Sequence, residues 1–294
     1  MNSGIYEQMR EKFILPNAYQ DWTKYRKKVT ELIIESAKVK RSDDDSGVKH
    51  KKIAIIGAGR CNDFDLVEII QRYVGVTLID IDADSMEGAI SWMPERVRSR
   101  VTIKPGTITG ITEEDQKNFC NGLLAEIMNN RNSFDQETFT GIIKNGQYKL
   151  AKKLNQFEKD FVEMLPENEY DVVVCLGVHS QLFSVIHYFV KMLMVNVADQ
   201  IFHGAVLDGT EIEELFKAMN DNIIPVLNSA LIKCAGTRLI LGNELDIVNP
   251  IEGAYQCIRN MRMRELNMSE QYLEWNFNPE NNVKYNMLIQ IVDK

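Results

Sequence analysis

The chain has 294 residues, of which 45% are hydrophobic and 26% are charged, and its formal net charge is −8. This composition is typical of a folded globular protein and excludes wholesale disorder, a collagen-like repeat and a small disulfide-stapled scaffold. The negative charge argues against a broad contact with nucleic acid, because phosphate binding needs a concentrated positive surface. No apolar run has the roughly 18 residues of a membrane span, and the first residues are charged where a secretion signal is apolar. We expect a cytoplasmic protein with no membrane or nucleic-acid partner.

Five cysteines are spread along the chain and form no CxxC pair. They are Cys61, Cys120, Cys175, Cys234 and Cys257. The odd number and the apolar surroundings of most of them predict reduced, buried thiols. The histidines have no partners at metal-ligand spacing, and His187, within FSVIHYF, is expected to be a buried helical residue. We therefore expect no metal site.

The first residues predict an N-terminal helical cap over 1–45. Apolar residues recur at helical spacing from residue 6 to residue 40, with an interruption at Pro16. The stretch 40–52 is dense in charge, Ser and Gly and predicts a linker. Residues 1–52 hold 12 basic and 8 acidic side chains, so a basic arm precedes an acidic body. A solvated helical surface is expected there, with contact to an anionic substrate or partner as the alternative.

Five aliphatic runs separated by helical spacing predict an α/β fold with a mainly parallel, doubly wound sheet. The runs are 53–56, 76–80, 101–104, 170–176 and 237–242. Two further strands, 273–277 and 284–292, flank the turn-rich NPENN and predict an antiparallel hairpin. The main domain is predicted over 50–294. Its helical insertion, 111–166, is expected to lie over the functional edge of the sheet.

The loop after the first strand contains Gly57, Ala58 and Gly59. In an open parallel sheet, ligands bind beyond the carboxyl ends of the strands, and glycines let a ligand approach the backbone closely. A tight turn without a ligand is the alternative for these glycines. Asp80 closes the second strand, where a carboxylate can accept both hydroxyls of an adenosine ribose. Asp82 and Asp84, which could cap the next helix, are the alternative for this role.

Both a dinucleotide and S-adenosylmethionine contain the adenosine that this crevice predicts. A dinucleotide fingerprint needs a third glycine at the sixth position of GxGxxG, and that position is Asn62 here. Asp63 follows and places a negative charge where a diphosphate would lie. A cofactor with an ammonium and a sulfonium group is attracted there, so the electrostatics favour S-adenosylmethionine.

Several segments resemble, in the right order, the motifs of class I S-adenosylmethionine-dependent methyltransferases. These are IAIIGAGRCND, LIDID, IKPGTI, YDVVVCLGVHSQL and ALIKCAGTRLILGNE, followed by EWNFN and KYNMLIQIVD for the closing strands. The resemblance covers about residues 50–110 and 168–294. It implies a Rossmann-like seven-stranded sheet in the order 3-2-1-4-5-7-6 with the last strand antiparallel.

The resemblance also implies contacts for single residues. Gly57, Ala58 and Gly59 would pass beneath the methionine portion of the cofactor, and Asp80 would hold the ribose. Other matched residues would border the adenine (Ile81, Thr107, Ile108) or line the methyl-donor side (Leu176, Gly177, Val178).

Three positions depart from the family pattern. Ile55 stands where an acid is usual, Cys61 where the third glycine is usual, and Thr107 where an acid is common after the third strand. Asp63 or Asn62 would then replace the lost contact to the amino group of the cofactor.

Methyl transfer requires mainly positioning and desolvation, with a base only when the nucleophile arrives protonated. His179, just beyond the fourth strand, is the candidate catalytic base, and a purely local hydrogen bond is its alternative. Gln181 is a candidate for orienting the substrate. Trp22 and Tyr25 are candidates for closing the pocket over it, with core packing as their alternative.

Further charged residues near the strand ends are expected to be solvated. Glu244 and Asp246 follow the fifth strand, where contact with a cationic substrate is the alternative. Arg259, Arg262 and Arg264 lie in a helical stretch, where binding of a carboxylate is the alternative.

The sequence predicts a methyltransferase that uses S-adenosylmethionine and acts on a small-molecule or peptide-sized acceptor. The alternatives are an NAD(P)-dependent oxidoreductase, which shares the crevice, and a relative that keeps the fold without catalysis. The acceptor atom and the oligomeric state are left open.

Overall fold

The computed structural model describes residues 8–9, 11–12, 14–38, 51–130, 135–154, 164–204, 207–245, 252–262 and 267–294. Residues 40–50 of the expected linker lie outside the described residues, and Lys52 already begins the first strand. Asp246, Arg264 and His50 also lie outside them.

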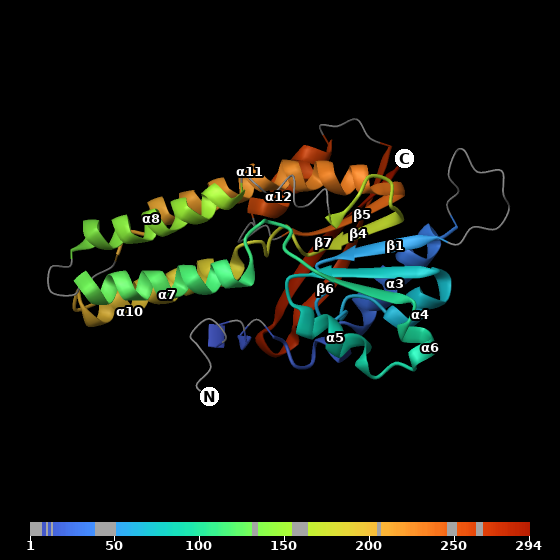
Figure 1. Cartoon of the computed structure of the whole chain (residues 1–294), viewed down its shortest axis with the longest axis horizontal. Coiled ribbons are helices and arrows are strands. Elements are labelled where there is room, and N and C mark those ends of the chain that lie inside the picture. The colour runs from blue at the N-terminus through green and yellow to red at the C-terminus, as the bar shows by residue number, and fades with distance from the viewer. Residues whose placement is uncertain are drawn as a thin grey trace.

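Seven strands form one sheet in the order β3-β2-β1-β4-β5-β7-β6 (Figure 1). Strands β1 to β5 pair in parallel, and β7 runs antiparallel to both of its neighbours, β5 and β6. The strands are β1 (Lys52–Ile56), β2 (Gly75–Asp80), β3 (Val101–Pro105), β4 (Tyr170–Leu176), β5 (Ala235–Leu245), β6 (Met268–Asn278) and β7 (Val283–Asp293). The predicted fold class and strand order are confirmed.

The last three strands are longer than predicted. β5 continues beyond Gly242 because its pairing with β7 runs from Arg238 opposite Asp293 to Leu245 opposite Asn286. The apolar run ends at Gly242, so polar residues that sequence reasoning placed in a loop belong to the strand. A short 3-10 turn, η1 (Pro279–Asn281), joins β6 to β7, and Asn282 takes a left-handed conformation with φ of 54°. The predicted hairpin is therefore confirmed.

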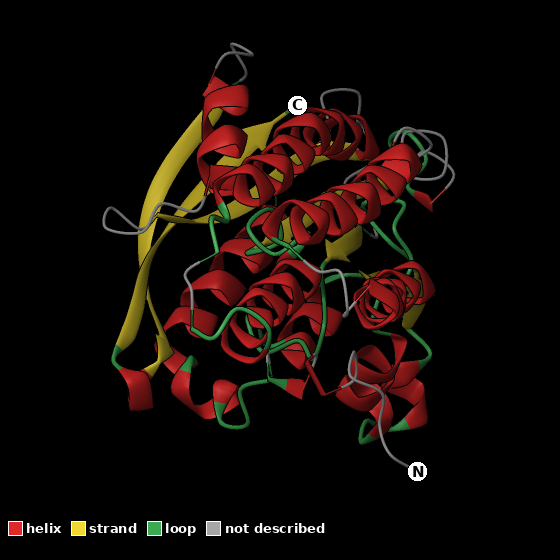
Figure 2. Cartoon of the chain, turned by 90° about the vertical axis from the view of Figure 1, so that its left-hand side faces the viewer, coloured by secondary structure: helices red, strands yellow, loops and turns green. Residues whose placement is uncertain are grey.

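Helices cover both faces of the sheet. They are α2 (Ala18–Asp21), α3 (Thr23–Ser36), α4 (Leu66–Arg72), α5 (Ala83–Ser91), α6 (Glu95–Arg98), α7 (Glu113–Asn130), α8 (Gln136–Leu154), α10 (Ser184–Gln200), α11 (Thr210–Cys234) and α12 (Glu252–Arg262). Four of these, α7, α8, α10 and α11, project together as a helical arm (Figure 1). Figure 2 looks along this arm. The described part of the insertion thus packs beside α10 and α11.

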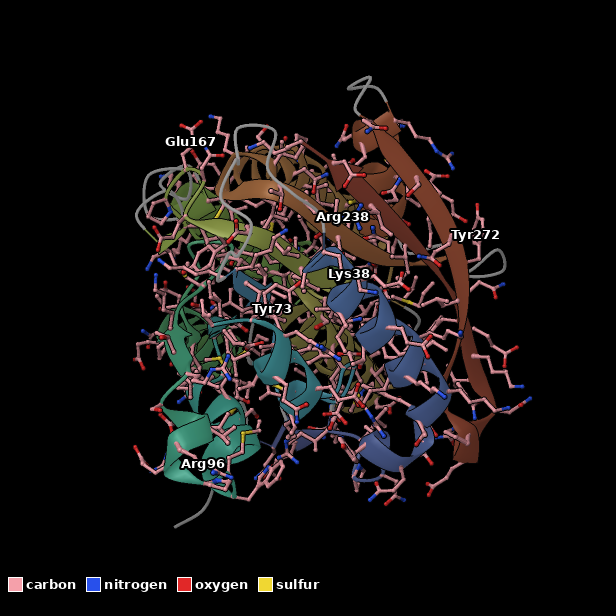
Figure 3. All side chains as sticks on the ribbon, turned by 90° about the vertical axis from the view of Figure 1, so that its right-hand side faces the viewer. Lys38, Tyr73, Arg96, Glu167, Arg238 and Tyr272 are labelled. Carbon is pink, nitrogen blue, oxygen red and sulfur yellow. The ribbon has the colours of Figure 1, made fainter. Side chains whose placement is uncertain are left out.

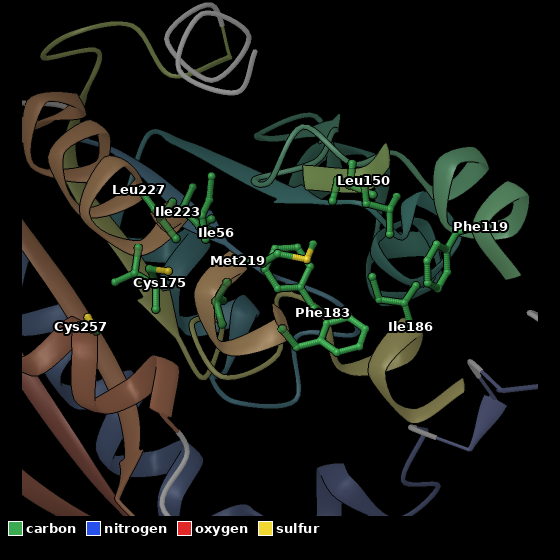
Figure 4. Close-up of a cluster of buried hydrophobic side chains, with 14 of the residues drawn as sticks. Ile56, Phe119, Leu150, Cys175, Phe183, Ile186, Met219, Ile223, Leu227 and Cys257 are labelled. Carbon is green, nitrogen blue, oxygen red and sulfur yellow. The ribbon is translucent and has the colours of Figure 1, made fainter. Parts of the chain in front are cut away.

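Two hydrophobic clusters lie on opposite faces of the sheet. Along β1 the side chains alternate between them: Ala54 and Ile56 belong to the cluster of the helical arm, and Ile53 and Ile55 to the cluster beneath α3. Figure 4 shows part of the first cluster, in which Ile56 lies among side chains of the arm. Burial on both faces explains why the parallel strands are continuous aliphatic runs.

Helix α3 lies on the second face of the sheet beside α4 (Figure 3). The buried Tyr73 hydroxyl donates a hydrogen bond of 2.7 Å to the carbonyl of Ile33. Thr30 Oγ1 accepts a hydrogen bond of 2.8 Å from the N–H of Asp65, which caps α4. The N-terminal segment is therefore attached to the loop that follows β1.

None of the described helices combines the length and the apolar character that a membrane span requires.

Candidate functional site

The loop after β1 depends on two glycines with left-handed backbone conformations. The φ angles are +69° at Gly57 and +46° at Gly59. A Cβ atom on Gly57 would lie 2.3 Å from Cγ2 of Val178, so no other residue fits without displacing that side chain. The N–H groups of Gly57 and Ala58 donate to the carbonyl of Ile79 at 2.8 and 3.2 Å. The glycines form a tight turn that joins the ends of β1 and β2, and their contact with a ligand stays a prediction.

Asp80 lies at the end of β2, half-buried, with both carboxylate oxygens held by the backbone. Oδ2 accepts a hydrogen bond of 2.9 Å from the N–H of Gly59, and Oδ1 accepts one of 2.9 Å from the N–H of Asp82. Burial raises the pKa of Asp80, and these hydrogen bonds oppose the rise. Asp82 instead caps α5, because its side chain accepts from Ser85 N–H at 3.0 Å. Of the two acids, Asp80 has the geometry of a ligand group with free lone pairs.

A pocket of about 220 Å³ follows the glycine loop. Its lining residues are Ile14, Leu15, Ala18, Trp22, Gly57, Ala58, Gly59, Arg60, Asn62, Asp63, Ser85 and Phe277. A neighbouring pocket of about 380 Å³ shares Ile14, Arg60 and Ser85 with it and continues along α5 past Asp82. Together they form a groove of the size that small-molecule ligands occupy. The N-terminal segment lines this groove, whereas α7 and α8 contribute no lining residue.

Asp63 lines the groove and lies among charges from other elements. Burial and the neighbouring carboxylate of Glu244 raise the pKa of Asp63 to about 7, and the guanidinium of Arg26 opposes the rise. Burial raises the pKa of the Cys61 thiol, and the carboxylate of Asp63 adds to this rise. Asp63 therefore titrates near neutral pH and gains its full charge when a cation approaches.

The sequence predicted that Glu244 is a solvated loop residue, and the structure shows that this prediction was wrong. It lies inside β5 with 3% of its surface exposed, and its Oε2 accepts a hydrogen bond of 2.8 Å from the hydroxyl of Ser180. Burial raises its pKa, and the Ser180 hydrogen bond and His179 oppose the rise. In the sequence, Glu244 lies only two residues beyond the predicted end of the fifth strand. The strand continues through Glu244 because it pairs there with β7, which is distant in sequence.

Aromatic rings pack beside these acids. The ring of Tyr25 stacks on that of Trp275 at 5.1 Å between centroids, and the ring of Trp22 contacts the same tryptophan edge-on at 4.8 Å. Trp22 also donates from Nε1 to the carbonyl of Phe277 at 2.9 Å. Trp22 lines the groove, whereas Tyr25 is buried and does not. Both residues pack in the core, which was the alternative for them, and their contact with a substrate stays a prediction.

His179 is completely buried between β4, α11 and α12. Its Nε2 is 2.8 Å from Oδ1 of Asn228. Burial lowers the pKa of His179, but the adjacent thiols of Cys257 and Cys175 outweigh this and raise it. His179 in turn lowers the pKa of the Cys257 thiol against the effect of burial. This geometry supports a local hydrogen bond as the role of His179. The side chain has no access to solvent, and catalysis by His179 stays a prediction.

The other predicted contacts lie around the strand ends. Gly177 has φ of +62° and donates to the carbonyl of Gly242 at 2.8 Å, and Leu176 and Val178 beside it are nearly buried. Thr107 Oγ1 is 3.0 Å from Oγ1 of Thr109. Ile108 packs against the cluster of the arm, Ile81 is half-buried, and Gln181 is exposed. Their cofactor and substrate contacts stay predictions, since none of them lines the groove.

Charged residues elsewhere have local partners. Arg262 forms two hydrogen bonds with the carboxylate of Glu270, at 3.2 and 3.1 Å. The sequence predicted a buried His187, but its side chain is 29% exposed and its Nε2 lies 2.8 Å from the carboxylate of Glu213 in α11. Among the described residues, no group of three or more His, Cys, Asp or Glu side chains is arranged to hold a metal ion.

No protein-family model matches the chain, and no curated protein matches it. Solved structures do. A SAM-dependent methyltransferase from Aquifex aeolicus is 8% identical, with a TM-score of 0.44, over 99% of this chain and 100% of that one. A precorrin-6y C5,15-methyltransferase from Geobacter metallireducens is 8% identical, with a TM-score of 0.40, over 91% of this chain and 87% of that one. The protein PH0851 is 10% identical, with a TM-score of 0.41, over 90% of this chain and 45% of its own length, so this chain spans less than half of that protein.

The strand order of this chain confirms, at the level of the fold, the resemblance to class I methyltransferases. All three TM-scores lie below 0.5, so function has to be argued from the chain's own residues.

Proposed function

We propose that this protein is an S-adenosylmethionine-dependent methyltransferase whose cofactor lies in the groove along the glycine loop. The observation that carries the proposal is the arrangement of Asp80 and Gly59. A half-buried carboxylate, held by two N–H groups at the end of β2, stands directly beside a left-handed glycine of the β1 loop. Carboxylates in this position bind the ribose hydroxyls of adenosine cofactors.

The charges along the groove fit the methionine portion of this cofactor, which is a zwitterion with a positive sulfur. Asp63 offers a carboxylate for the ammonium group. Arg60, the only cation among the described lining residues, offers a partner for the carboxylate of the cofactor. A dinucleotide fits less well, because its diphosphate would face the carboxylate of Asp63. The loop also lacks the third glycine that allows a diphosphate to approach the backbone.

The chain's own residues position and enclose the cofactor. The cofactor supplies an electrophilic methyl group on a sulfonium. Asp80 is not itself a lining residue, but its carboxylate is bonded to Gly59 of the lining, and in this proposal it orients the adenosine end. Asp63 holds the amino end, and Ile14, Leu15 and Trp22 cover the groove. Positioning and desolvation of this kind account for much of the acceleration of an in-line displacement. We further propose a small-molecule or peptide-sized acceptor, because the net charge of −8 disfavours a large nucleic acid, and we propose a cytoplasmic location.

Binding of S-adenosylhomocysteine and of NAD, compared by calorimetry, tests the proposal. S-adenosylhomocysteine is expected to bind, and NAD is not. Asp80→Ala is expected to weaken S-adenosylhomocysteine binding by about 1–3 kcal/mol, the usual loss for a charge-assisted hydrogen bond. Glu87→Ala, which removes an exposed acid of α5, is the matched control and leaves binding unchanged. Asp80→Asn, which keeps an acceptor for Gly59, serves if the alanine variant unfolds. NAD binding, or equal S-adenosylhomocysteine binding by the Asp80 variants, would sink the proposal.

A further inference from the structure

A second hollow lies on the helical arm, away from the groove. Its volume is about 280 Å³, and each described residue that lines it belongs to α7 or α8. The buried side chains of Phe119, Leu123 and Leu150 form its apolar floor, and the exposed Gly122 leaves its wall open. α7 and α8 form one layer of the arm, in front of α10 and α11 (Figure 1), and the hollow opens on the outside of this layer.

The charged side chains around the hollow are already paired with one another. Lys153 forms an ion pair with Asp115, and Nζ of Lys149 lies 3.6 Å from Oε1 of Glu126. A small ion therefore finds no unpaired charge among these four side chains. The apolar floor instead favours a hydrophobic side chain from another molecule.

Two large hydrophobic side chains are exposed next to residues that line the hollow. Met128 of α7 is 62% exposed, and Tyr148 of α8 is 64% exposed. Exposed positions recur along both helices at spacings of three and four residues, so they share one face. We define the α7/α8 face by these exposed residues: Glu114, Asn118, Gly122, Ala125, Met128, Asn145, Tyr148 and Lys152. Of this set, only Glu114 and Lys152 are charged.

The two helices carry opposite charges. α7 has four acidic residues and one lysine, net −3, and α8 has four lysines and one glutamate, net +3. The helices run antiparallel, because Lys153 near the end of α8 contacts Asp115 near the start of α7. A two-fold axis parallel to the helices places α7 of one copy over α8 of another, so that opposite charges meet twice. An axis across the helices would place like charges together.

We propose that the α7/α8 face is the interface of a symmetric dimer, whose second member is another copy of this chain. The inference goes beyond the proposed catalytic function, because the face shares no residue with the groove. Helices of 18 and 19 residues are each about 27 Å long, at about 1.5 Å per residue. Two helices about 10 Å apart present a face about 20 Å wide. Two such faces bury about 1,100 Å², which exceeds the roughly 1,000 Å² of a specific interface.

The two-fold axis also determines which residues meet, because it leaves each position along the helices unchanged. A Cβ atom on Gly146 of α8 would lie 2.9 Å from Phe119 and 3.0 Å from Leu123 of α7, so these residues are level with one another. Tyr148 of one copy therefore lies over Gly122 of the other copy. Helical side chains lean toward the N-terminus of their helix, and the ring of Tyr148 can enter the hollow there. The largest exposed ring of the face thus meets the residue that has no side chain.

The same axis brings opposite charges together at one end of the face. The ion pair between Lys153 and Asp115 shows that the end of α8 is level with the start of α7. Glu114 of one copy therefore lies over Lys152 of the other copy, and the symmetry repeats this contact. Nζ of Lys152 lies 4.5 Å from the ring centroid of Tyr148 in the same chain, so the charged contact and the aromatic contact are adjacent.

Sedimentation of the full chain over a range of protein concentrations tests the proposal. The wild type is expected to dimerise. Tyr148→Ala is expected to raise the dissociation constant of the dimer about tenfold or more, because an aromatic anchor is lost. Tyr272→Ala is the matched control, since Tyr272 of β6 is 61% exposed, and it should leave the dissociation constant unchanged. A monomer at every concentration overturns the inference, and so does a dimer that Tyr272→Ala weakens more than Tyr148→Ala.

Exchange of the two charges identifies the helix that each helix faces. Lys152→Glu is expected to weaken the dimer about tenfold, because two like-charge contacts replace two ion pairs. Adding Glu114→Lys to the same chain restores opposite charges and brings the dissociation constant back toward the wild-type value. Lys24→Glu, at an exposed position of α3, is the control for net charge, and circular dichroism checks that each variant is folded. A dimer that Lys152→Glu leaves unchanged, or that the double variant does not restore, overturns the inference.

Discussion

Asp63 is a side chain whose charge depends on residues from three other parts of the chain. Glu244 of β5 faces it with a like charge, Arg26 of α3 with an opposite one, and Tyr25 and Cys61 lie beside it. Its folded-state pKa of about 7 lies above the ordinary value of 3.8. The folded protein therefore holds a proton that the unfolded chain releases between these two values, and the stability of the fold depends on pH in that interval.

Replacing Asp63 with asparagine is expected to stabilise the protein at neutral pH. Because the pKa is raised, the free energy of unfolding falls as the pH rises from about 4 to 7 and levels off above that range. Asp63→Asn stays neutral and avoids this loss, so its free energy of unfolding should exceed the wild-type value by about 1–3 kcal/mol at pH 8, at about 1.4 kcal/mol per pKa unit and with a reduction for partial exposure.

Urea denaturation at pH 5 and pH 8 measures this difference. The gain should shrink at pH 5. Asp199→Asn, at an exposed position of α10, is the control and should change stability by less than about 0.5 kcal/mol at either pH. A gain that is the same at both pH values would show that Asp63 is not the titrating group.

Helix α3 connects the N-terminal segment to the sheet. It contributes Tyr25, Val29 and Ile33 to the cluster on the second face and accepts hydrogen bonds from Tyr73 and from the loop after β1. A helix of 14 residues is marginal in isolation, so its stability comes from these tertiary contacts. Its placement in turn sets the position of Trp22 over the groove.

Tyr73→Phe is expected to lower the free energy of unfolding by about 1 kcal/mol, because the ring stays packed and only the hydrogen bond to the carbonyl of Ile33 is lost. Chemical denaturation measures the loss. Tyr272→Phe, at a residue of β6 that is 61% exposed, is the matched control and should have almost no effect. Equal stability of the two variants would mean that the Tyr73 hydroxyl does not hold α3.

At the scale of the whole molecule, the groove is assembled from segments that are far apart in the chain. Residues 14–22, the loop after β1, Ser85 of α5 and Phe277 of β6 all line it. The helical arm, although large, contributes nothing to its walls. A ligand in the groove would therefore contact both the N-terminal segment and the sheet, and we expect ligand binding to stabilise this segment.

S-adenosylhomocysteine is expected to slow amide hydrogen exchange in residues 14–22, because ligand contacts stabilise their closed position. Hydrogen exchange followed by mass spectrometry measures this, with residues 113–130 of α7, which contribute no lining residue, as the internal control. A severalfold slowing confined to the lining segments is expected. Protection of α7 by the same factor would indicate global stabilisation rather than local stabilisation of the groove.

The sequence by itself determined the strands and the glycine loop, and the resemblance of its motifs to class I methyltransferases supplied the strand order. Buried parallel strands must be aliphatic on both faces, and a left-handed turn that touches Val178 must be glycine, so these features leave local signals. The place of Asp80 at a strand end was also predictable. One of its backbone hydrogen bonds comes from the turn that follows, at Asp82, and the other comes from Gly59 in the loop after β1.

Only the tertiary structure decided the character of the site behind the loop. Glu244 is buried because β7, more than forty residues away, extends β5 beyond its apolar run. Tyr25 lies near Glu244 because α3 packs against β6. His179 is buried away from the groove, where its Nε2 contacts Asn228 of α11. These contacts depend on which helices and strands become neighbours in space. The spacing of residues along the chain does not predict which elements become neighbours.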